Sequence, residues 1–268
     1  MFLDQFPSSV KLSASECPVI FDFQTFLPAQ FHGSPFGTDD LLYLADEASV
    51  DRMVVMPAIT SRPDNASLAA SIRSTDRLVG CAAVNPASGK TAVDELEESI
   101  QLGLRGLRLS PATHQFEIDD ATVDPLMEIA LRQNIPVTTE SCSQHCSPIQ
   151  VANLADRFPD VNIIADVGFR PVAPPVSLGQ PEPPAGRIAD QALDRPNLFL
   201  GLTALATAET YLIKRILDTI SVDRLVFGSN APTSIPCFSI GGVRQANLGE
   251  EAEALFLGNT LSGIYNLI

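Results

Sequence analysis

Basic side chains are scarce in this sequence, which has 17 Lys and Arg against 32 Asp and Glu in 268 residues and a formal net charge of -15. Nucleic acids and anionic membrane surfaces are bound by clustered Lys and Arg, so the composition argues against both as partners. Long apolar runs are missing too: no stretch approaches the roughly 18 apolar residues of a membrane span, and the first residues lack a signal-peptide core. We therefore expect a soluble, cytoplasmic protein.

Cysteine is also sparse. The five cysteines are an odd and small number for a chain of this length, which favours reduced thiols over a disulfide framework. They are Cys17, Cys81, Cys142, Cys146 and Cys237.

What the chain does contain is a regular alternation of short strand-like runs with segments of helical periodicity. The strand-like runs are residues 19–24, 52–57, 77–84, 105–110, 136–141, 161–167, 197–203 and 224–227. The helical segments are residues 39–48, 66–73, 91–102, 124–133, 149–157, 187–193 and 209–220. Eight strands alternating with helices predict an α/β fold, a single (β/α)8 TIM barrel spanning residues 1–268 with residues 1–17 as an N-terminal extension. A doubly wound open sheet is the structural alternative.

One segment interrupts this alternation. Residues 170–186 contain six prolines, and this predicts neither a helix nor a central strand there. The segment follows the sixth expected strand, which places it on the side of the barrel mouth. It is either a lid or wall of a pocket, or an exposed loop.

Several motifs occur in an order that resembles a known family. They are residues 19–27, 80–86, 103–111, 134–137, 158–168, 223–232 and 257–260. In this order they resemble the amidohydrolase-related barrels, the branch that includes metal-dependent hydrolases and decarboxylases of aromatic and related acids. The resemblance implies that the chemistry lies at the carboxyl ends of the strands.

The resemblance also implies a set of metal-ligand positions, and this chain departs from the family at each of them. Gln24 and Phe26 stand where the family has a His-any-His pair, and Glu140 and Asp166 stand where it has single histidines. Asn230 replaces the Asp that binds metal and accepts a proton from water, and an amide is no general base. We therefore expect no zinc site and no resident cofactor.

Three alternatives remain for the polar residues at these positions. Gln24, Glu140, Asp166 and Asn230 form an oxygen-rich set, which suits Mg²⁺ or another hard divalent ion better than zinc. Without an ion, two neighbouring carboxylates can act as an acid and base pair, so Glu140, Asp166 and Asn230 are the catalytic candidates. Alternatively, the two carboxylates pair with Arg108 or Arg170 as a buried structural network.

Arg108 is the first candidate for binding a ligand, because a guanidinium at a barrel mouth can hold a carboxylate or phosphate through two hydrogen bonds. Arg170 is a second candidate. Gln24, Phe26 and His114 complete the predicted substrate-binding set. The expected ligand is a small anionic molecule.

A cluster of Cys142, His145 and Cys146 follows the fifth strand, and Cys237 follows the eighth. The cluster lacks the paired C-x2-C spacing of structural zinc sites. We expect ordinary loop thiols, with zinc binding or a nucleophilic Cys142 as the alternatives.

Two classes of function follow. The first, which we prefer, is a barrel that binds a small molecule or is catalytically silent. The second is a hydrolase or lyase acting on a small anionic organic substrate through a metal-independent or hard-ion mechanism. The identity of the substrate and the pairing of two copies in a homodimer stay open.

Overall fold

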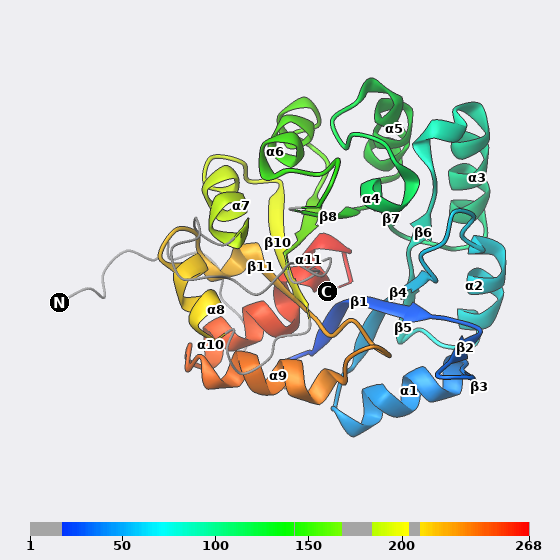
Figure 1. Ribbon diagram of the computed structural model, residues 1–268. Coiled ribbons are helices and arrows are strands. Elements are labelled where there is room, and N and C mark those ends of the chain that lie inside the picture. Colours follow the sequence, from blue (N-terminus) through cyan, green and yellow to red (C-terminus); the bar gives the residue numbers. More distant parts are fainter. Residues whose placement is uncertain (1–17, 142, 168–183, 204–209, 268) are drawn as a thin grey trace.

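The computed structural model describes residues 18–141, 143–167, 184–203 and 210–267. Parallel strands form its centre, and helices surround them (Figure 1). Hydrogen bonds join the strands in the orders β1-β4-β5 and β11-β10-β9-β8-β7-β6. The strands are β1 (Phe21–Leu27), β4 (Arg52–Pro57), β5 (Leu78–Gly80), β6 (Ala82–Ala83), β7 (Leu107–Leu109), β8 (Val137–Glu140), β9 (Ile163–Asp166), β10 (Leu198–Thr203) and β11 (Leu225–Gly228).

The two sheets join into one barrel at two seams. Strands β5 and β6 are one run that changes partner at Cys81, whose N–H donates to Val55 at 2.8 Å, while the N–H of Ala82 donates to Gly106 at 2.9 Å. At the other seam, the N–H of Phe26 in β1 donates to the carbonyl of Ala231 after β11 at 2.8 Å. The closed ring has eight strand positions, so the predicted (β/α)8 barrel is confirmed.

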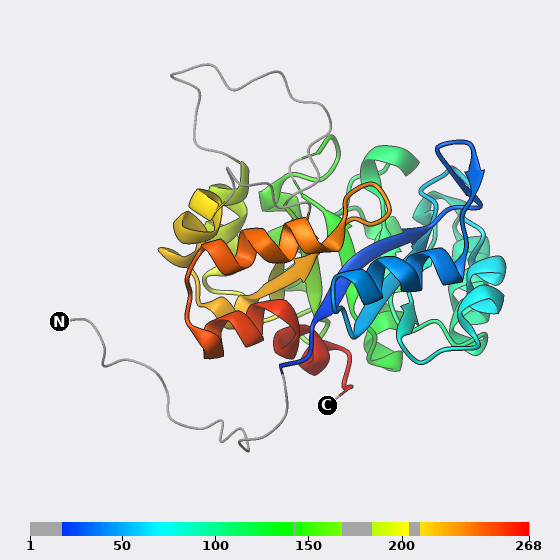
Figure 2. The ribbon, with the colours of Figure 1, turned by 90° about the horizontal axis from the view of Figure 1, so that it is seen from below.

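Helices follow the strands in the predicted alternation. They are α1 (Thr38–Glu47), α2 (Asn65–Ile72), α3 (Lys90–Gln101), α5 (Asp124–Gln133), α6 (Pro148–Arg157), α7 (Pro184–Ala192) and α8 (Thr210–Leu217). A short hairpin of β2 (Gln30–Phe31) and β3 (Ser34–Pro35) precedes α1, and α4 (Pro111–His114) precedes α5. The chain closes with α9 (Pro236–Gln245), α10 (Glu250–Ala254) and α11 (Thr260–Ile264), and α9 lies beside α1 over the seam between β1 and β11 (Figure 2).

Three differences from the sequence prediction have physical reasons. Helix α7 begins at Pro184, inside the segment predicted to lack helix, because the first turn of a helix tolerates proline. Helix α9 was not predicted, since Gly241 and Gly242 weaken its helical signal. Strand β1 runs on to Leu27, so Gln24 lies within the strand and not at its end. Arg170, the rest of the proline-rich segment through residue 183 and residues 1–17 lie outside the described residues.

Phe23 fills the barrel interior below the mouth. A Cβ on Gly201 in β10 would stand 2.2 Å from its ring, and one on Gly228 in β11 would stand 2.6 Å from it, so both strands need glycine at these positions. Towards the amino-terminal end of the barrel, the rings of Phe21 and Tyr265 pack with centroids 5.8 Å apart, and Tyr265 follows α11. Side chains thus close the barrel at its amino-terminal end.

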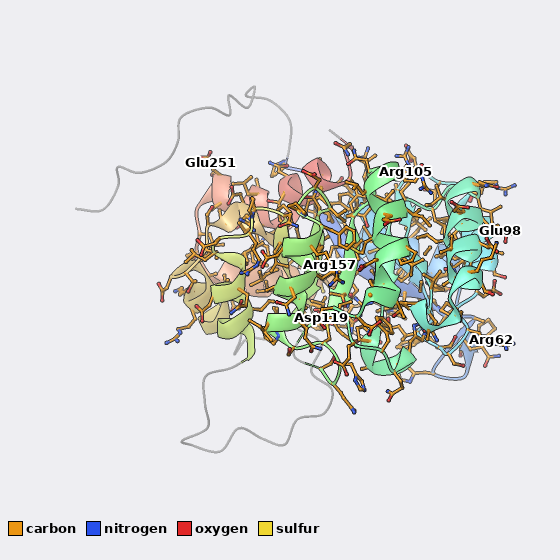
Figure 3. The ribbon with its side chains drawn as sticks, turned by 90° about the horizontal axis from the view of Figure 1, so that it is seen from above. Arg62, Glu98, Arg105, Asp119, Arg157 and Glu251 are labelled. Carbon is orange, nitrogen blue, oxygen red and sulfur yellow. The ribbon has the colours of Figure 1, made fainter. Side chains whose placement is uncertain are left out.

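Charged side chains such as those of Glu98 and Glu251 lie on the outer surface and point away from the barrel (Figure 3). Within the described part of the chain, no helix is long and apolar enough to cross a membrane.

Candidate functional site

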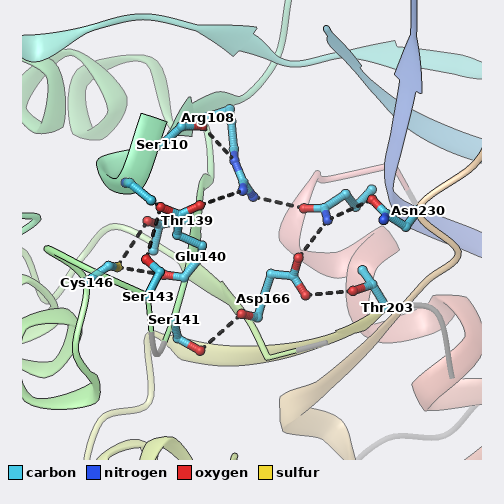
Figure 4. Close-up of polar contacts among 12 residues, drawn as sticks. Arg108, Ser110, Thr139, Glu140, Ser141, Ser143, Cys146, Asp166, Thr203 and Asn230 are labelled. Atoms are coloured by element: carbon cyan, nitrogen blue, oxygen red, sulfur yellow. Dashed lines mark hydrogen bonds and ion pairs between the residues drawn. The ribbon is translucent and has the colours of Figure 1, made fainter. Parts of the chain in front are cut away.

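Six polar side chains meet at the carboxyl ends of the strands. Each comes from a different strand or from the turn directly after it, and five of the six are at most 2% exposed. Asn230, which follows β11, is partly exposed. The six are Gln24, Arg108, Glu140, Asp166, Thr203 and Asn230 (Figure 4).

Gln24 connects the guanidinium of Arg108 to the carboxylate of Asp166. Its carbonyl Oε1 accepts a hydrogen bond from Nη1 of Arg108 at 2.9 Å, and its Nε2 donates to Oδ2 of Asp166 at 2.7 Å. The hydroxyl of Thr203 donates to the other Asp166 oxygen at 2.8 Å. Because a guanidinium can only donate and a carboxylate can only accept, these contacts fix the orientation of the Gln24 amide.

Glu140 is held on the opposite side of Arg108. Its Oε1 accepts from the N–H of Ala112 at 2.6 Å, in the first turn of α4, and from the hydroxyl of Ser143 at 3.1 Å. Its Oε2 lies 3.8 Å from Nη2 of Arg108, an ion pair without close contact. The predicted alternative of an Arg108–Glu140 pair is therefore observed, and Asp166 joins the network through Gln24.

Asn230 lies at the edge of the network, where it reaches solvent. Its backbone has φ of 64°, in the left-handed region that Asn tolerates better than most residues. Its N–H donates to the carbonyl of Gln24 at 3.0 Å, and its Oδ1 lies 3.5 Å from Nε2 of Gln24. Phe26, two residues after Gln24, is also partly buried. Asn230 and Phe26 thus form the accessible edge of the network.

His114 lies at the end of α4 and is 7% exposed. Its Nε2 donates to the carbonyl of Thr60 at 2.9 Å, because a carbonyl can only accept, and its buried Nδ1 has no hydrogen-bond partner in the part of the chain that the structure describes. No hydrogen bond joins His114 to Arg108 or Gln24 in the described residues. Its predicted role in substrate binding stays a prediction.

The described members of the cluster after β8 make separate contacts. Cys146 is buried, and its Sγ donates to the backbone carbonyl of Glu140 at 2.7 Å. His145 pairs with Glu117 at 2.5 Å, and Cys237 is exposed on α9. Cys142 lies outside the described residues. The described thiols therefore do not converge on one centre.

Sequence reasoning missed two members of the site. Thr203 ends β10 and could have been found as a polar residue at a strand end. Asp22 lies in β1, is fully buried, and accepts the backbone N–H groups of Gln24 and Ser229, both at 3.0 Å. Burial raises the pKa of Asp22 from 3.8 to about 7, and the hydrogen bonds from Ser229 and Gln24 lower it by less.

The oxygen atoms at the mouth do not fit a divalent ion in this arrangement. Both carboxylate oxygens of Asp166, the Gln24 carbonyl and Oε1 of Glu140 already accept hydrogen bonds from protein donors. The guanidinium of Arg108 lies among them, and a second cation there would be repelled. Over the described ranges, no group of three or more His, Cys, Asp or Glu side chains could hold a metal ion.

Comparison with known proteins identifies the family. The family model described as amidohydrolase matches residues 27–260, so this chain belongs to the amidohydrolase family, as its motifs predict. A search of curated proteins gave no match.

Solved structures share the barrel. An amidohydrolase from Burkholderia multivorans with bound HEPES is 14% identical, with a TM-score of 0.75 over 92% of this chain and 99% of that one. An uncharacterized barrel protein from Bordetella bronchiseptica is 17% identical, with a TM-score of 0.73 over 92% and 98%. A 2,6-dihydroxybenzoate decarboxylase from Rhizobium is 14% identical, with a TM-score of 0.71 over 94% and 99%. At such identities the likeness shows the fold alone.

Proposed function

We propose that this amidohydrolase-family barrel binds a small organic anion at its mouth, with the guanidinium of Arg108 as the cation of the site in place of a zinc ion. The observation that carries the proposal is the position of Arg108. It is buried at the carboxyl end of β7, between the side chains that occupy the customary ligand positions of the family. A buried guanidinium attracts a carboxylate more strongly than an exposed one, because water does not screen it.

The Nη2 group of Arg108 has hydrogen-bond donors left for such a ligand, although it pairs with Glu140. A guanidinium has five N–H donors, and Arg108 donates through Nε to Ser110 at 3.3 Å and through Nη1 to Gln24. In the described part of the chain Nη2 makes no hydrogen bond, and its nearest carboxylate oxygen is 3.8 Å away in Glu140. The side-chain NH2 of Asn230 offers a second donor, and the ring of Phe26 an apolar wall.

The solved relatives support an acidic small molecule. The Rhizobium structure is that of a decarboxylase of an aromatic acid, and a probable 2-pyrone-4,6-dicarboxylic acid hydrolase from Acinetobacter baumannii, 15% identical with a TM-score of 0.70, was solved with citric acid bound. A structure of the Burkholderia amidohydrolase contains zinc. Our proposal keeps the ligand class of these proteins and replaces the ion by Arg108.

Binding to the metal-stripped protein tests the proposal. Isothermal titration calorimetry with citrate, succinate and benzoate at constant ionic strength should detect binding of at least one acid. Arg108→Gln should weaken it at least about tenfold, the contribution of a charged hydrogen bond. Arg132→Gln is the matched control, since Arg132 pairs with Glu97 at 2.9 Å on the surface. Equal binding by Arg108→Gln, or binding that requires added zinc, would contradict the proposal.

A second candidate function is a lyase or hydrolase in which Glu140 is the base. It is favoured by the position of Glu140, whose Oε1 accepts the N–H of Ala112 and whose Oε2 faces the guanidinium of Arg108. Product analysis by mass spectrometry, after incubation with the acids that bind, separates the two functions. Turnover that disappears in Glu140→Gln while binding persists would establish the enzyme, and unchanged acids would leave the binding function.

A further inference from the structure

Strand β1 contains one residue more than its neighbour just before the mouth. Phe21 and Asp22 pair with Arg52 and Met53 of β4, but the next pair is Thr25 with Val55. Three steps along β1 therefore correspond to two steps along β4, which defines a β-bulge at Phe23 and Gln24.

The bulge lets two consecutive side chains face the barrel interior. In a regular strand, neighbouring side chains point to opposite faces. Phe23 points inward, because its ring occupies the space beside Gly201 and Gly228. Gln24 also points inward, to Arg108 and Asp166. Without the extra residue, Gln24 would face the surrounding helices and the chain from Arg108 to Asp166 would be broken.

Two side chains stabilise the backbone of this bulge. Oδ1 of Asp22 accepts the N–H of Gln24 at 3.0 Å, two residues along the strand, and also the N–H of Ser229 at 3.0 Å, at the end of β11. The hydroxyl of Thr25 donates to the carbonyl of Val54, the residue opposite the bulge, at 2.9 Å. Oδ1 of Asp22 thus holds the backbone of β1 at the bulge and connects it to the end of β11, the strand that precedes Asn230.

We propose that Asp22 is the positioning residue of the mouth: through Oδ1 it forms the bulge that turns Gln24 into the barrel and so joins Arg108 to Asp166. Among the described residues, no hydrogen bond joins Asp22 to the six mouth side chains, so its effect passes through the backbone. The proposal rests on the proposed function only for its consequence, which is that replacing Asp22 lowers the affinity for the anion. The geometry can be tested without a ligand.

Nuclear magnetic resonance of the Gln24 side-chain amide reports this position directly. Its two N–H signals are assigned by their absence in Gln24→Met. Asp22→Ala should shift both signals towards those of a solvent-exposed glutamine, and Asp22→Val, of similar volume, should do the same if the alanine variant does not fold. Asp22→Asn should leave them in place, because it keeps the accepting oxygen Oδ1. The oxygen that it replaces, Oδ2, has no hydrogen-bond partner among the described residues.

Asp51→Ala is the matched control. Oδ2 of Asp51 accepts the N–H of Ile20 at 2.8 Å, a similar contact between a carboxylate and the backbone before the other end of β1. This variant should lose stability and leave the Gln24 signals unchanged. Unshifted signals in folded Asp22→Ala or Asp22→Val would overturn the proposal, as would an equal shift in Asp22→Asn or Asp51→Ala. A failure of anion binding would leave these signals unaffected, so the two proposals fail separately.

Discussion

Replacing Asp22 by Asn removes a carboxyl group whose pKa burial raises from 3.8 to about 7. The folded protein therefore holds a proton that the unfolded chain has released. The stability due to this proton is fully present below pH 3.8 and is lost progressively as the pH rises to about 7. At neutral pH the buried carboxyl group of Asp22 therefore lowers the stability of the native state.

The size of the effect follows from the two pKa values. The full difference of about three pKa units corresponds to roughly 4 kcal/mol, and the part lost between about pH 5.5 and 7.5 is roughly 2 kcal/mol. The amide introduced by Asp22→Asn cannot ionise, so the free energy of unfolding of this variant minus that of the wild type should grow by about 2 kcal/mol over this interval.

Urea unfolding followed by circular dichroism at the two pH values measures this difference, and groups that titrate alike in both proteins cancel. Asp51→Asn serves as the control, because Asp51 accepts the backbone N–H of Ile20, just before the other end of β1. A difference between wild type and Asp22→Asn that stays constant with pH would refute the reasoning, since Asp22 would then have an ordinary pKa.

Two further predictions concern the barrel interior and the mouth. Gly201→Ala should destabilise the fold by about 1–3 kcal/mol in urea unfolding, because its Cβ would stand 2.2 Å from the Phe23 ring. The control Gly241→Ala, in open space on α9, should be neutral or stabilising. Equal effects of the two substitutions would contradict the packing described. Asn230→Gly should keep the stability measured by the same assay, because glycine accepts the φ of 64°, and should weaken anion binding in calorimetry through loss of its amide; unchanged binding would remove Asn230 from the site.

The sequence predicts the barrel more fully than it predicts the site. The alternation of strands and helices predicts the eight strand positions, and Asp124–Pro125 marks the start of α5. The periodicity of the strand cannot predict the bulge, because the bulge depends on a hydrogen bond between Asp22 and Ser229, which are 207 residues apart. The family motifs locate Gln24 and Asn230, yet only the folded chain shows the amide of Gln24 between a cation and a carboxylate.

The central claim is that the cation at the mouth of this barrel is Arg108. The most direct test is a crystal structure of the protein grown with zinc and citrate, with anomalous scattering recorded at the zinc edge. The account predicts no zinc peak among Gln24, Glu140 and Asp166, and a guanidinium of Arg108 still bonded to Gln24. A zinc peak with Glu140 and Asp166 as ligands, and Arg108 displaced, would contradict it.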